Sequence, residues 1–281
     1  YGQKGIDTYQ RSPQFQVVWS HSQDAKANPN RTFSANVNFS TSGYDKQNSL
    51  SAENYLRTQK SSSISYSKRW ENSPFSMSAN FRHSQNSTDS TLTLSFPEMT
   101  FNMSKIYPLK FKNRKGSAKW YEQFGFSYSV NMRNTITAKE KEILQKSFLT
   151  DWQNGIQHNL PISLPGFNLF KYINMSPSFS YSEKWYFSHI EKTWYPDQTF
   201  LDRYGRPTHI KTDTITGLKR NYQYSYSLSA STNIYGMFMP KNPKSKIVGI
   251  RHKVSPSLSF SYNPDFGNPK YGFWKQVQQD S

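Results

Sequence analysis

Strict alternation of side-chain type in two stretches constrains the fold more than any other feature of this chain. Residues 254–262 carry Val, Pro, Leu, Phe and Tyr at the even positions and serine at every odd position between them. Residues 176–182 repeat the pattern as Ser-Pro-Ser-Phe-Ser-Tyr-Ser. Successive side chains of a β-strand point to opposite faces of the sheet. Each stretch is therefore predicted to be a strand with one apolar, aromatic face and one face of small hydroxyl groups.

A face made of small hydroxyl groups favours a membrane barrel over a soluble sandwich. The polar face of a soluble sandwich meets bulk water and is usually rich in Lys, Glu and Thr. A membrane barrel instead needs apolar side chains toward lipid and small polar ones toward a wet lumen. We therefore predict an all-β chain, an antiparallel transmembrane β-barrel in which aromatic side chains face lipid. The residues predicted to face the lumen are Ser127, Ser129, Asn131, Ser257, Ser259 and Ser261.

The composition agrees with alternating strands that are half in contact with water. Hydrophobic residues make up 34% of the 281 residues, and the mean hydropathy is −0.85. The sequence has no apolar run of the ~18 residues that a membrane-spanning helix needs. Aromatic residues nevertheless reach 16%, which is far too many for a disordered chain of this polarity. A soluble all-β protein stays open as an alternative at this point.

The net charge of +17 predicts an anionic partner, either nucleic acid or phosphorylated lipid. Residues 105–119 hold six basic side chains and no acidic one. Ammonium and guanidinium groups pair strongly with phosphate oxygens, so this segment is predicted to meet the phosphates of a lipid. A solvated loop is the alternative. Aromatic residues recur regularly over many strands, whereas a platform for single-stranded nucleic acid needs only a few, so no nucleic-acid partner is predicted. The predicted phosphate contacts are Lys110, Lys112, Arg114 and Lys115.

The alternation divides the chain into about ten strands. Two segments break the strand pattern: residues 138–152 are predicted to form a loop helix capped by Thr137, and residues 188–219 a long irregular connection. Residues 48–59 are predicted to be a short helix or a loop. The first strand and the last are predicted not to pair with each other, as edges of an arc of a larger barrel. The predicted strands are 15–21, 32–41, 63–70, 75–84, 91–96 with 99–106, 120–132, 157–164, 173–187, 222–235 and 247–262.

No pattern in the sequence indicates an enzyme or a cofactor site. The six histidines are scattered, and no His-x-x-x-His pair suggests a metal. The sequence has no Gly-x-Ser-x-Gly elbow, no phosphate-binding P-loop and no Gly-x-Gly-x-x-Gly fingerprint. Cysteine is absent, which excludes disulfides and thiolate metal sites within these residues. Tyr1 opens the chain without a signal peptide, so we expect a piece excised from a longer protein.

Three segments resemble the barrel region of LptD, the lipopolysaccharide-assembly family, and more narrowly its Bacteroidota form. They are residues 157–165 (QHNLPISLP), 174–186 (NMSPSFSYSEKWY) and 250–266 (IRHKVSPSLSFSYNPDF). The resemblance implies an outer-membrane barrel of the largest class in a Gram-negative cell, inserting lipopolysaccharide into the outer leaflet. The partners that it implies are lipopolysaccharide, a plug lipoprotein of the LptE type, a periplasmic bridge protein and outer-membrane lipids. Residues 1–281 would be one part of that barrel domain, without the family's N-terminal jellyroll.

Two further readings of the sequence stay open beside this one. The first is another large outer-membrane barrel, such as a secretion translocon or a TonB-dependent transporter. The second is a soluble, aromatic-rich sheet that binds carbohydrate. Pro177 and Pro256 lie within predicted strands, where a proline removes one hydrogen-bond donor from the ladder. Both prolines are predicted to mark bulges or strand starts.

Overall fold

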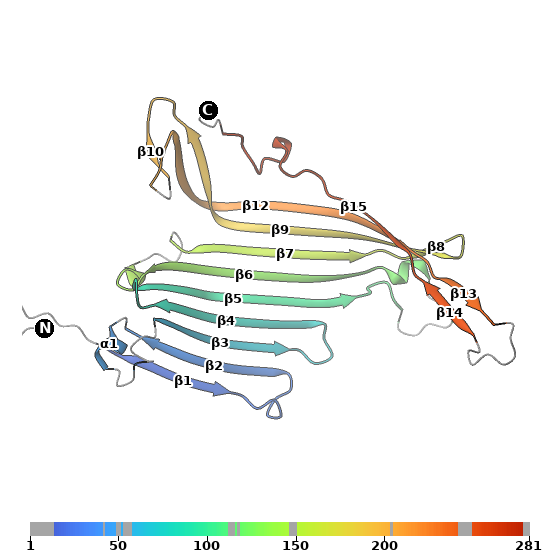
Figure 1. Cartoon of the computed structure of the whole chain (residues 1–281), viewed down its shortest axis with the longest axis horizontal. Helices are drawn as coiled ribbons and strands as arrows, with labels where there is room; N and C mark the ends of the chain where they lie inside the picture. Colours follow the sequence, from blue (N-terminus) through green and yellow to red (C-terminus); the bar gives the residue numbers. More distant parts are fainter. Residues whose placement is uncertain are drawn as a thin grey trace, which may run out of the picture.

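Ten long strands form one sheet in the computed structural model (Figure 1). The structure describes residues 14–41, 43–48, 52, 58–111, 116, 119–145, 151–202, 205–240 and 249–277. The ten strands are β1 (Gln16–Ser22), β2 (Arg31–Ser40), β3 (Gln59–Arg69), β4 (Phe75–Asn86), β5 (Thr91–Ile106), β6 (Gly125–Lys139), β7 (Gln153–Ser163), β9 (Ile173–Trp194), β12 (Ile210–Ser231) and β15 (Ser257–Tyr262). This number and the all-β antiparallel architecture confirm the predicted fold class.

The strands pair in the order of the sequence, which is the simplest topology for an antiparallel sheet. The order is β1-β2-β3-β4-β5-β6-β7-β9-β12-β15, and the short strand β8 (Phe167–Leu169) pairs with β9. Among the described residues, β1 pairs only with β2 and β15 only with β12. The prediction that the first and last strands do not pair with each other is therefore confirmed, and both are open edges.

Small elements connect the long strands. Among the described residues no helix is long and apolar enough to cross a membrane. Two short hairpins stand apart from the main sheet. The hairpins are β10 (Phe200–Leu201) with β11 (Pro207–Thr208), and β13 (Ile234–Phe238) with β14 (Ile250–Val254). The helical elements whose bounds fall within the described residues are α1 (Tyr44–Asn48) and three single turns, η1 (Trp120–Gln123), η2 (Ile143–Gln145) and η3 (Pro269–Tyr271).

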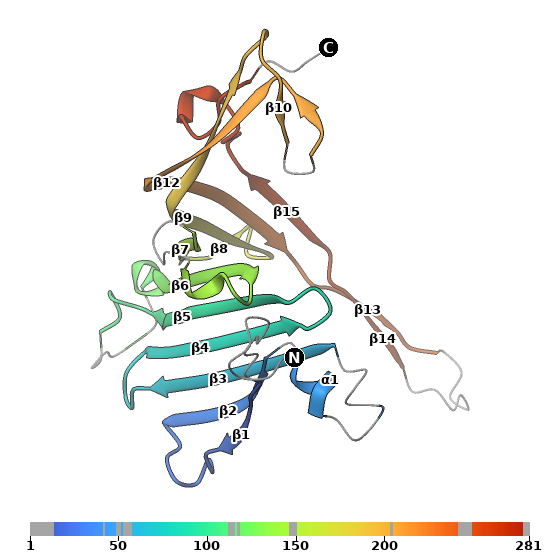
Figure 2. The same ribbon diagram turned by 90° about the vertical axis from the view of Figure 1, so that its left-hand side faces the viewer.

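The sheet is a single layer and buries almost no hydrophobic core. Its strands follow one another from β1 to β12 in one twisted layer (Figure 2). The accessible surface is 21583 Å², whereas a compact monomer of 32.8 kDa exposes roughly 12,500 Å². Among the residues that the structure describes, only Ala35, Leu92, Ile136 and Phe266 are buried hydrophobic residues. The many exposed apolar side chains must therefore be covered by something other than the described chain, which argues against a compact soluble protein.

The prediction of an irregular connection at residues 188–219 is wrong. Strand β9 continues to Trp194 and β12 begins at Ile210, and the two remain paired out to Ile210↔Trp194. This outer part is a two-stranded ribbon that rises beyond the main sheet (Figure 1). Water reaches both faces of such a ribbon, so its strands do not need the apolar alternation by which the other strands were predicted.

The predicted loop helix at residues 138–152 is also wrong over its described part. Ala138 and Lys139 end strand β6, paired with Leu92 and Thr91, and Thr137 pairs with Thr93 instead of capping a helix. A single turn, η2, follows, and residues 146–150 lie outside the described residues. Ladder hydrogen bonds and burial of the neighbouring Ile136 against β5 prevail over the local helical pattern. In the 48–59 segment, α1 ends at Asn48 and most of the remaining residues are not described.

The prolines interrupt ladders in different ways. Pro256 directly precedes β15, as predicted for a strand start. Pro177 lies inside β9 and pairs with Leu228 without a bulge, so the prediction for this proline is wrong. On the other side of β9, pairing with β7 ends at Ser178 and pairing with β8 begins at Met175. Pro177 lies in this gap between two partners, where its missing N–H costs no ladder bond.

Candidate functional site

One face of the sheet carries a continuous row of apolar and aromatic side chains. Directly opposite residues of antiparallel strands place their side chains on the same face. The pairing can be followed from β6 to β15 through Phe126, Ile162, Phe179, Tyr226 and Tyr262. The rings of Phe179 and Tyr226 are 4.9 Å apart, in the range of favourable aromatic contacts. We name this side the aromatic face.

The opposite side, the hydroxyl face, carries serine and amide side chains that hydrogen-bond to one another. Ser129, Asn159 and Ser182 are paired across β6, β7 and β9. The Asn159 amide donates to Ser129 Oγ at 3.4 Å, and Ser182 Oγ donates to Asn159 Oδ1 at 3.0 Å. Ser229 and Ser259 continue this contact at the β15 edge, where their Oγ atoms are 3.3 Å apart. The face thus presents many weak, exchangeable donors and acceptors.

The structure brings all six residues predicted to face a lumen onto this hydroxyl face. Ser127, Ser129 and Asn131 alternate along β6, and Ser129 belongs to the hydroxyl row. On β15, Ser261 pairs with Ser227 of β12, whose pairing with Ser178 continues the same side. Ser257 and Ser259 follow the alternation of β15. That this face lines a lumen stays a prediction.

The two ends of the sheet differ strongly in charge. The connections β1–β2, β3–β4, β5–β6, β7–β9 and β12–β15 share one end, the right-hand end of Figure 1. These connections carry twelve Lys or Arg residues and three acidic residues in the sequence. The connections at the other end carry six Lys or Arg residues and eight acidic residues. We name the first end the basic end. The antiparallel topology brings the two basic stretches, 105–119 and 241–253, to this same end.

A shallow hollow of about 360 Å³ lies where the β5–β6 connection leaves the sheet. Lys105, Lys110 and Glu122 line it together with residues of β7 and the following turn. Glu122 is buried, and its carboxylate accepts the backbone N–H of Lys119 at 2.8 Å. An acidic group thus lies beside the basic segment that the sequence predicted. Lys110 is exposed here, and Lys112, Arg114 and Lys115 lie outside the described residues.

The model of one protein family, described as LptD protein, matches residues 1–281, which is the whole chain. The chain belongs to the LptD family. No curated protein matches it. Among solved structures, a double mutant of the Serratia marcescens hemophore receptor HasR in complex with its hemophore HasA and heme is similar, with 8% identity and a TM-score of 0.28. That match covers 75% of this chain and 31% of the receptor, so this chain spans about a third of the receptor's length.

LptD proteins are lipopolysaccharide-assembly proteins of the outer membrane, so the all-β sheet belongs to an outer-membrane β-barrel protein. The family match and the sheet confirm the resemblance and the predicted location in the outer membrane. The Bacteroidota form named in the resemblance stays a prediction.

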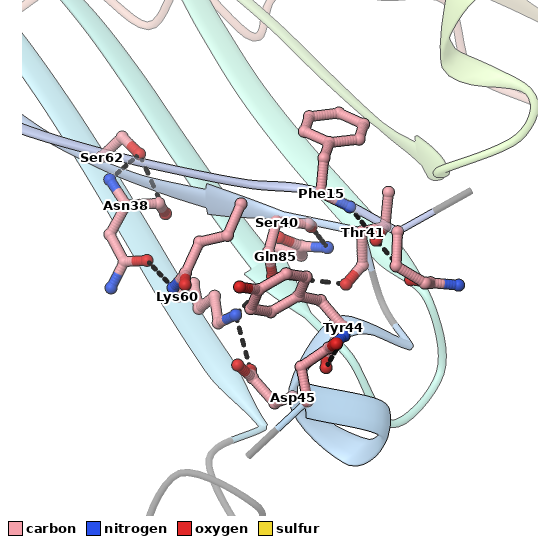
Figure 3. Close-up of polar contacts among 12 residues, drawn as sticks. Phe15, Asn38, Ser40, Thr41, Tyr44, Asp45, Lys60, Ser62 and Gln85 are labelled. Atoms are coloured by element: carbon pink, nitrogen blue, oxygen red, sulfur yellow. Dashed lines mark hydrogen bonds and ion pairs between the residues drawn. The ribbon is translucent and has the colours of Figure 1, made fainter. Parts of the chain in front are cut away.

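In this LptD-family sheet, the best-packed polar cluster lies under helix α1, and the sequence did not predict it (Figure 3). The Lys60 ammonium group forms an ion pair with Asp45 of α1 at 2.5 Å and contacts Ser40 Oγ, and the Lys60 side chain is only 1% exposed. Gln85 of β4 donates to the Ser40 carbonyl oxygen at 2.7 Å. The cluster fixes α1 to the ends of β2, β3 and β4. The sequence held one indication of this cluster, because Lys60 takes the same face of its strand as the apolar residues Ile64 and Tyr66.

A second unpredicted cluster lies on the aromatic face of β9 and β12. The Glu183 carboxylate accepts from the Trp185 indole N–H at 2.6 Å and from the Tyr181 hydroxyl at 2.5 Å. Arg220 forms an ion pair with the same carboxylate and donates to Tyr181 at 3.1 Å. The His158 ring contacts Trp185 at 4.4 Å. The sequence indicated this cluster as well, because Glu183 is a charged residue on the strand face that Phe179 and Tyr181 make aromatic.

The described residues contain no group of three or more side chains suited to a metal.

Proposed function

We propose that this chain is an arc of the barrel wall in a translocon that moves lipopolysaccharide from the periplasm to the outer leaflet. The observation that carries the proposal is a single sheet with one aromatic face, one hydroxyl face and two open edges, in a member of the LptD family. Unsatisfied backbone groups in hydrocarbon cost several kcal/mol each, so the edges require further strands in a membrane. The family match favours this function over a secretion translocon or another transporter.

The hydroxyl face would hold the sugar part of lipopolysaccharide in a hydrated lumen. A net hydrogen bond between neutral groups contributes only about 0.5–1.5 kcal/mol, so contacts with serine and asparagine exchange readily. The side chains of this face are too small to fill the interior of a barrel closed by ten strands, which supports a wide lumen. The acyl chains would leave sideways through the wall into lipid, on the side of the aromatic face.

The transport step would involve no covalent chemistry in this part of the protein, and its energy would come from elsewhere in the pathway. The partners of the proposed translocon are a plug lipoprotein of the LptE type and a periplasmic bridge protein. Residues 1–281 would form part of one barrel domain. These assignments follow from the family, and the open edges support the presence of further strands.

A photoreactive residue at Ser129 or at the neighbouring Tyr128 tests the proposal on the complete protein with its partners. The bilayer contains no lipopolysaccharide at the start, and lipopolysaccharide is then supplied by the energised pathway. We expect an early, energy-dependent crosslink at Ser129 of the hydroxyl face and none at Tyr128 of the aromatic face before lipopolysaccharide accumulates in the bilayer. Equal early crosslinking at both positions, or none at Ser129, would contradict a lumenal route along this face.

The basic end gives the proposal a second test. We propose that Lys110, Lys112, Arg114 and Lys115 contact lipid A or core phosphates during transfer. Charge reversal at Lys112, Arg114 and Lys115 is expected to weaken lipopolysaccharide crosslinking at residues 105–119. Matched charge reversal at Lys141 and Lys146, in the β6–β7 connection at the opposite end, serves as the control. An unchanged crosslink yield would identify residues 105–119 as an ordinary solvated loop.

A further inference from the structure

The hairpin of β13 and β14 stands apart from the main sheet. In both views it projects away from the eleven-stranded sheet at the basic end (Figures 1 and 2). Its two strands pair only with each other among the described residues, and all their side chains are exposed. An isolated two-stranded hairpin is marginally stable in water at best. A surface that covers the hairpin is therefore expected.

The pairing register gives the hairpin two chemically different faces. Ile234 lies opposite Val254 and Phe238 opposite Ile250, with Gly236 and His252 between these pairs. The four apolar side chains are 57%, 44%, 63% and 52% exposed in that order. This side is apolar apart from one imidazole.

The other face of the hairpin is cationic. Tyr235 lies opposite Lys253 and Met237 opposite Arg251. The Arg251 guanidinium lies 4.8 Å from the centroid of the Tyr235 ring, and the Lys253 ammonium lies 5.9 Å from it. Residues 234–254 contain five Lys or Arg residues and no Asp or Glu.

The position of the hairpin matches the boundary of the membrane. β13 begins three residues after Ser231, the last residue of β12, and this distance is at most about 10 Å of extended chain. The apolar face is thus held close to the level at which the strand leaves the sheet. The connection between β12 and β15 carries five Lys or Arg residues and no acidic one, and this charge excess complements an anionic lipid surface. Apolar side chains beside lysine and arginine are typical of elements that lie in the lipid headgroup layer.

We propose that the β13–β14 hairpin lies in the headgroup layer of the leaflet at the basic end. Ile234, Phe238, Ile250 and Val254 insert below the headgroups, while Arg251 and Lys253 pair with lipid phosphates. The hairpin thereby anchors the end of β12 and β15 to anionic lipid. This role is independent of the route that lipopolysaccharide takes through the protein.

Cysteine labelling in the complete protein tests this proposal, because the 281 residues contain no cysteine. An environment-sensitive fluorophore is placed by Phe238→Cys on the apolar face and, as a matched control, by Met237→Cys on the cationic face; the two native side chains are 63% and 67% exposed. The protein is reconstituted in phosphatidylcholine bilayers with or without phosphatidylglycerol. With phosphatidylglycerol, we expect lipid-borne quenchers to reach the label at 238 and aqueous iodide to reach the label at 237. Equal iodide quenching at both positions in both bilayers would overturn the proposal.

A charge variant distinguishes attraction to lipid from docking of a protein. Arg251→Ser with Lys253→Ser is expected to shift the hairpin toward the water-exposed state by about fivefold per charge removed, in the phosphatidylglycerol bilayers only. Unchanged resistance of the barrel to unfolding in detergent confirms that the variant is folded. The proposal would be overturned if the label at 238 became protected from iodide only after a partner protein is added. It would also be overturned if that protection changed neither with lipid charge nor with the two substitutions.

Discussion

At the scale of single residues, charged side chains at aromatic positions have identifiable partners in this sheet. Glu183 and Arg220 neutralise each other amid Tyr181 and Trp185, and Lys60 is neutralised by Asp45. Aromatic residues with polar groups are enriched at both membrane–water interfaces of outer-membrane barrels. The charges of Glu183 and Arg220 are thus compensated locally, which is compatible with a position on the aromatic face.

The facing of the two sides can be tested by placing arginine at neighbouring positions of β6. Val130→Arg on the aromatic face is expected to cost about 2–4 kcal/mol near mid-bilayer, and Ser129→Arg on the hydroxyl face little, because only the first puts a charge into lipid. The free energy of unfolding into urea from phospholipid vesicles measures both. A larger loss for Ser129→Arg would reverse the assignment of the two faces.

The ion pair under α1 predicts a different pattern of stability. Asp45→Asn leaves the buried Lys60 ammonium without its counter-charge and is expected to cost about 3–5 kcal/mol. Adding Lys60→Met to Asp45→Asn removes the uncompensated charge and should recover most of that loss. The free energies of unfolding of the single and double variants measure the coupling. Additive losses would show that the two side chains do not stabilise each other.

At the scale of elements, β9 and β12 are each 22 residues long, whereas a tilted strand crosses the hydrocarbon in about 9–11 residues. Their outer parts, beyond Tyr186 of β9, form the ribbon that extends beyond the sheet (Figure 1). The ribbon is polar: Lys211 pairs with Asp213 at 2.9 Å, and the hydrogen bond that its ammonium group donates to this carboxylate raises the pKa of Lys211. A register shift between Thr216 and Lys219 separates the ribbon from the rest of the strand pair.

Accessibility along β9 tests whether the ribbon lies outside the membrane. Ile190→Cys, whose native side chain is 63% exposed, is expected to react quickly with a membrane-impermeant maleimide. Phe179→Cys on the same strand should stay unreacted until detergent is added, because lipid covers the aromatic face. Labelling yields of the two variants in intact vesicles provide the measurement. Slow reaction at residue 190 combined with fast reaction at residue 179 would mean that the membrane level is misplaced.

At the scale of the whole molecule, the sheet has two open edges and two ends of different charge. Strands β1 and β15 each leave one side unpaired among the described residues. The connections at the basic end carry twelve basic and three acidic side chains. Those at the other end carry six basic and eight acidic side chains. A wall with these ends presents very different surfaces to the two sides of a membrane.

Disulfide trapping tests the open edges in the complete protein. The pair Trp19→Cys and Phe260→Cys joins β1 to β15 and is expected to form no disulfide, because the two strands are open edges that do not pair with each other. Ser229→Cys with Ser259→Cys is the positive control, since these residues are direct partners with Oγ atoms 3.3 Å apart. A disulfide between residues 19 and 260 in good yield would indicate a small closed barrel instead of a large translocon.

The sequence by itself determined the strands and the chemistry of their two faces. The alternation in residues 254–262 and in Ser127, Ser129 and Asn131 is a local property with a period of two, so it predicts which residues share a face. It also predicted the open edges, because the small inward side chains do not fill a small barrel. The family resemblance was carried by contiguous segments and was equally accessible.

Only the tertiary structure decided the features that depend on partners distant in sequence. Residues 138–139 continue a strand because β5 pairs with them, although their local pattern favours a helix. The ribbon of β9 and β12 forms through pairing of polar strands that have no alternation to reveal them. Lys60 is buried because α1 brings Asp45 over it. The connections that contain the two basic stretches leave the sheet at the same end because the strands pair in an antiparallel order. Pairing and burial are non-local, and a sequence pattern within one strand carries no information about them.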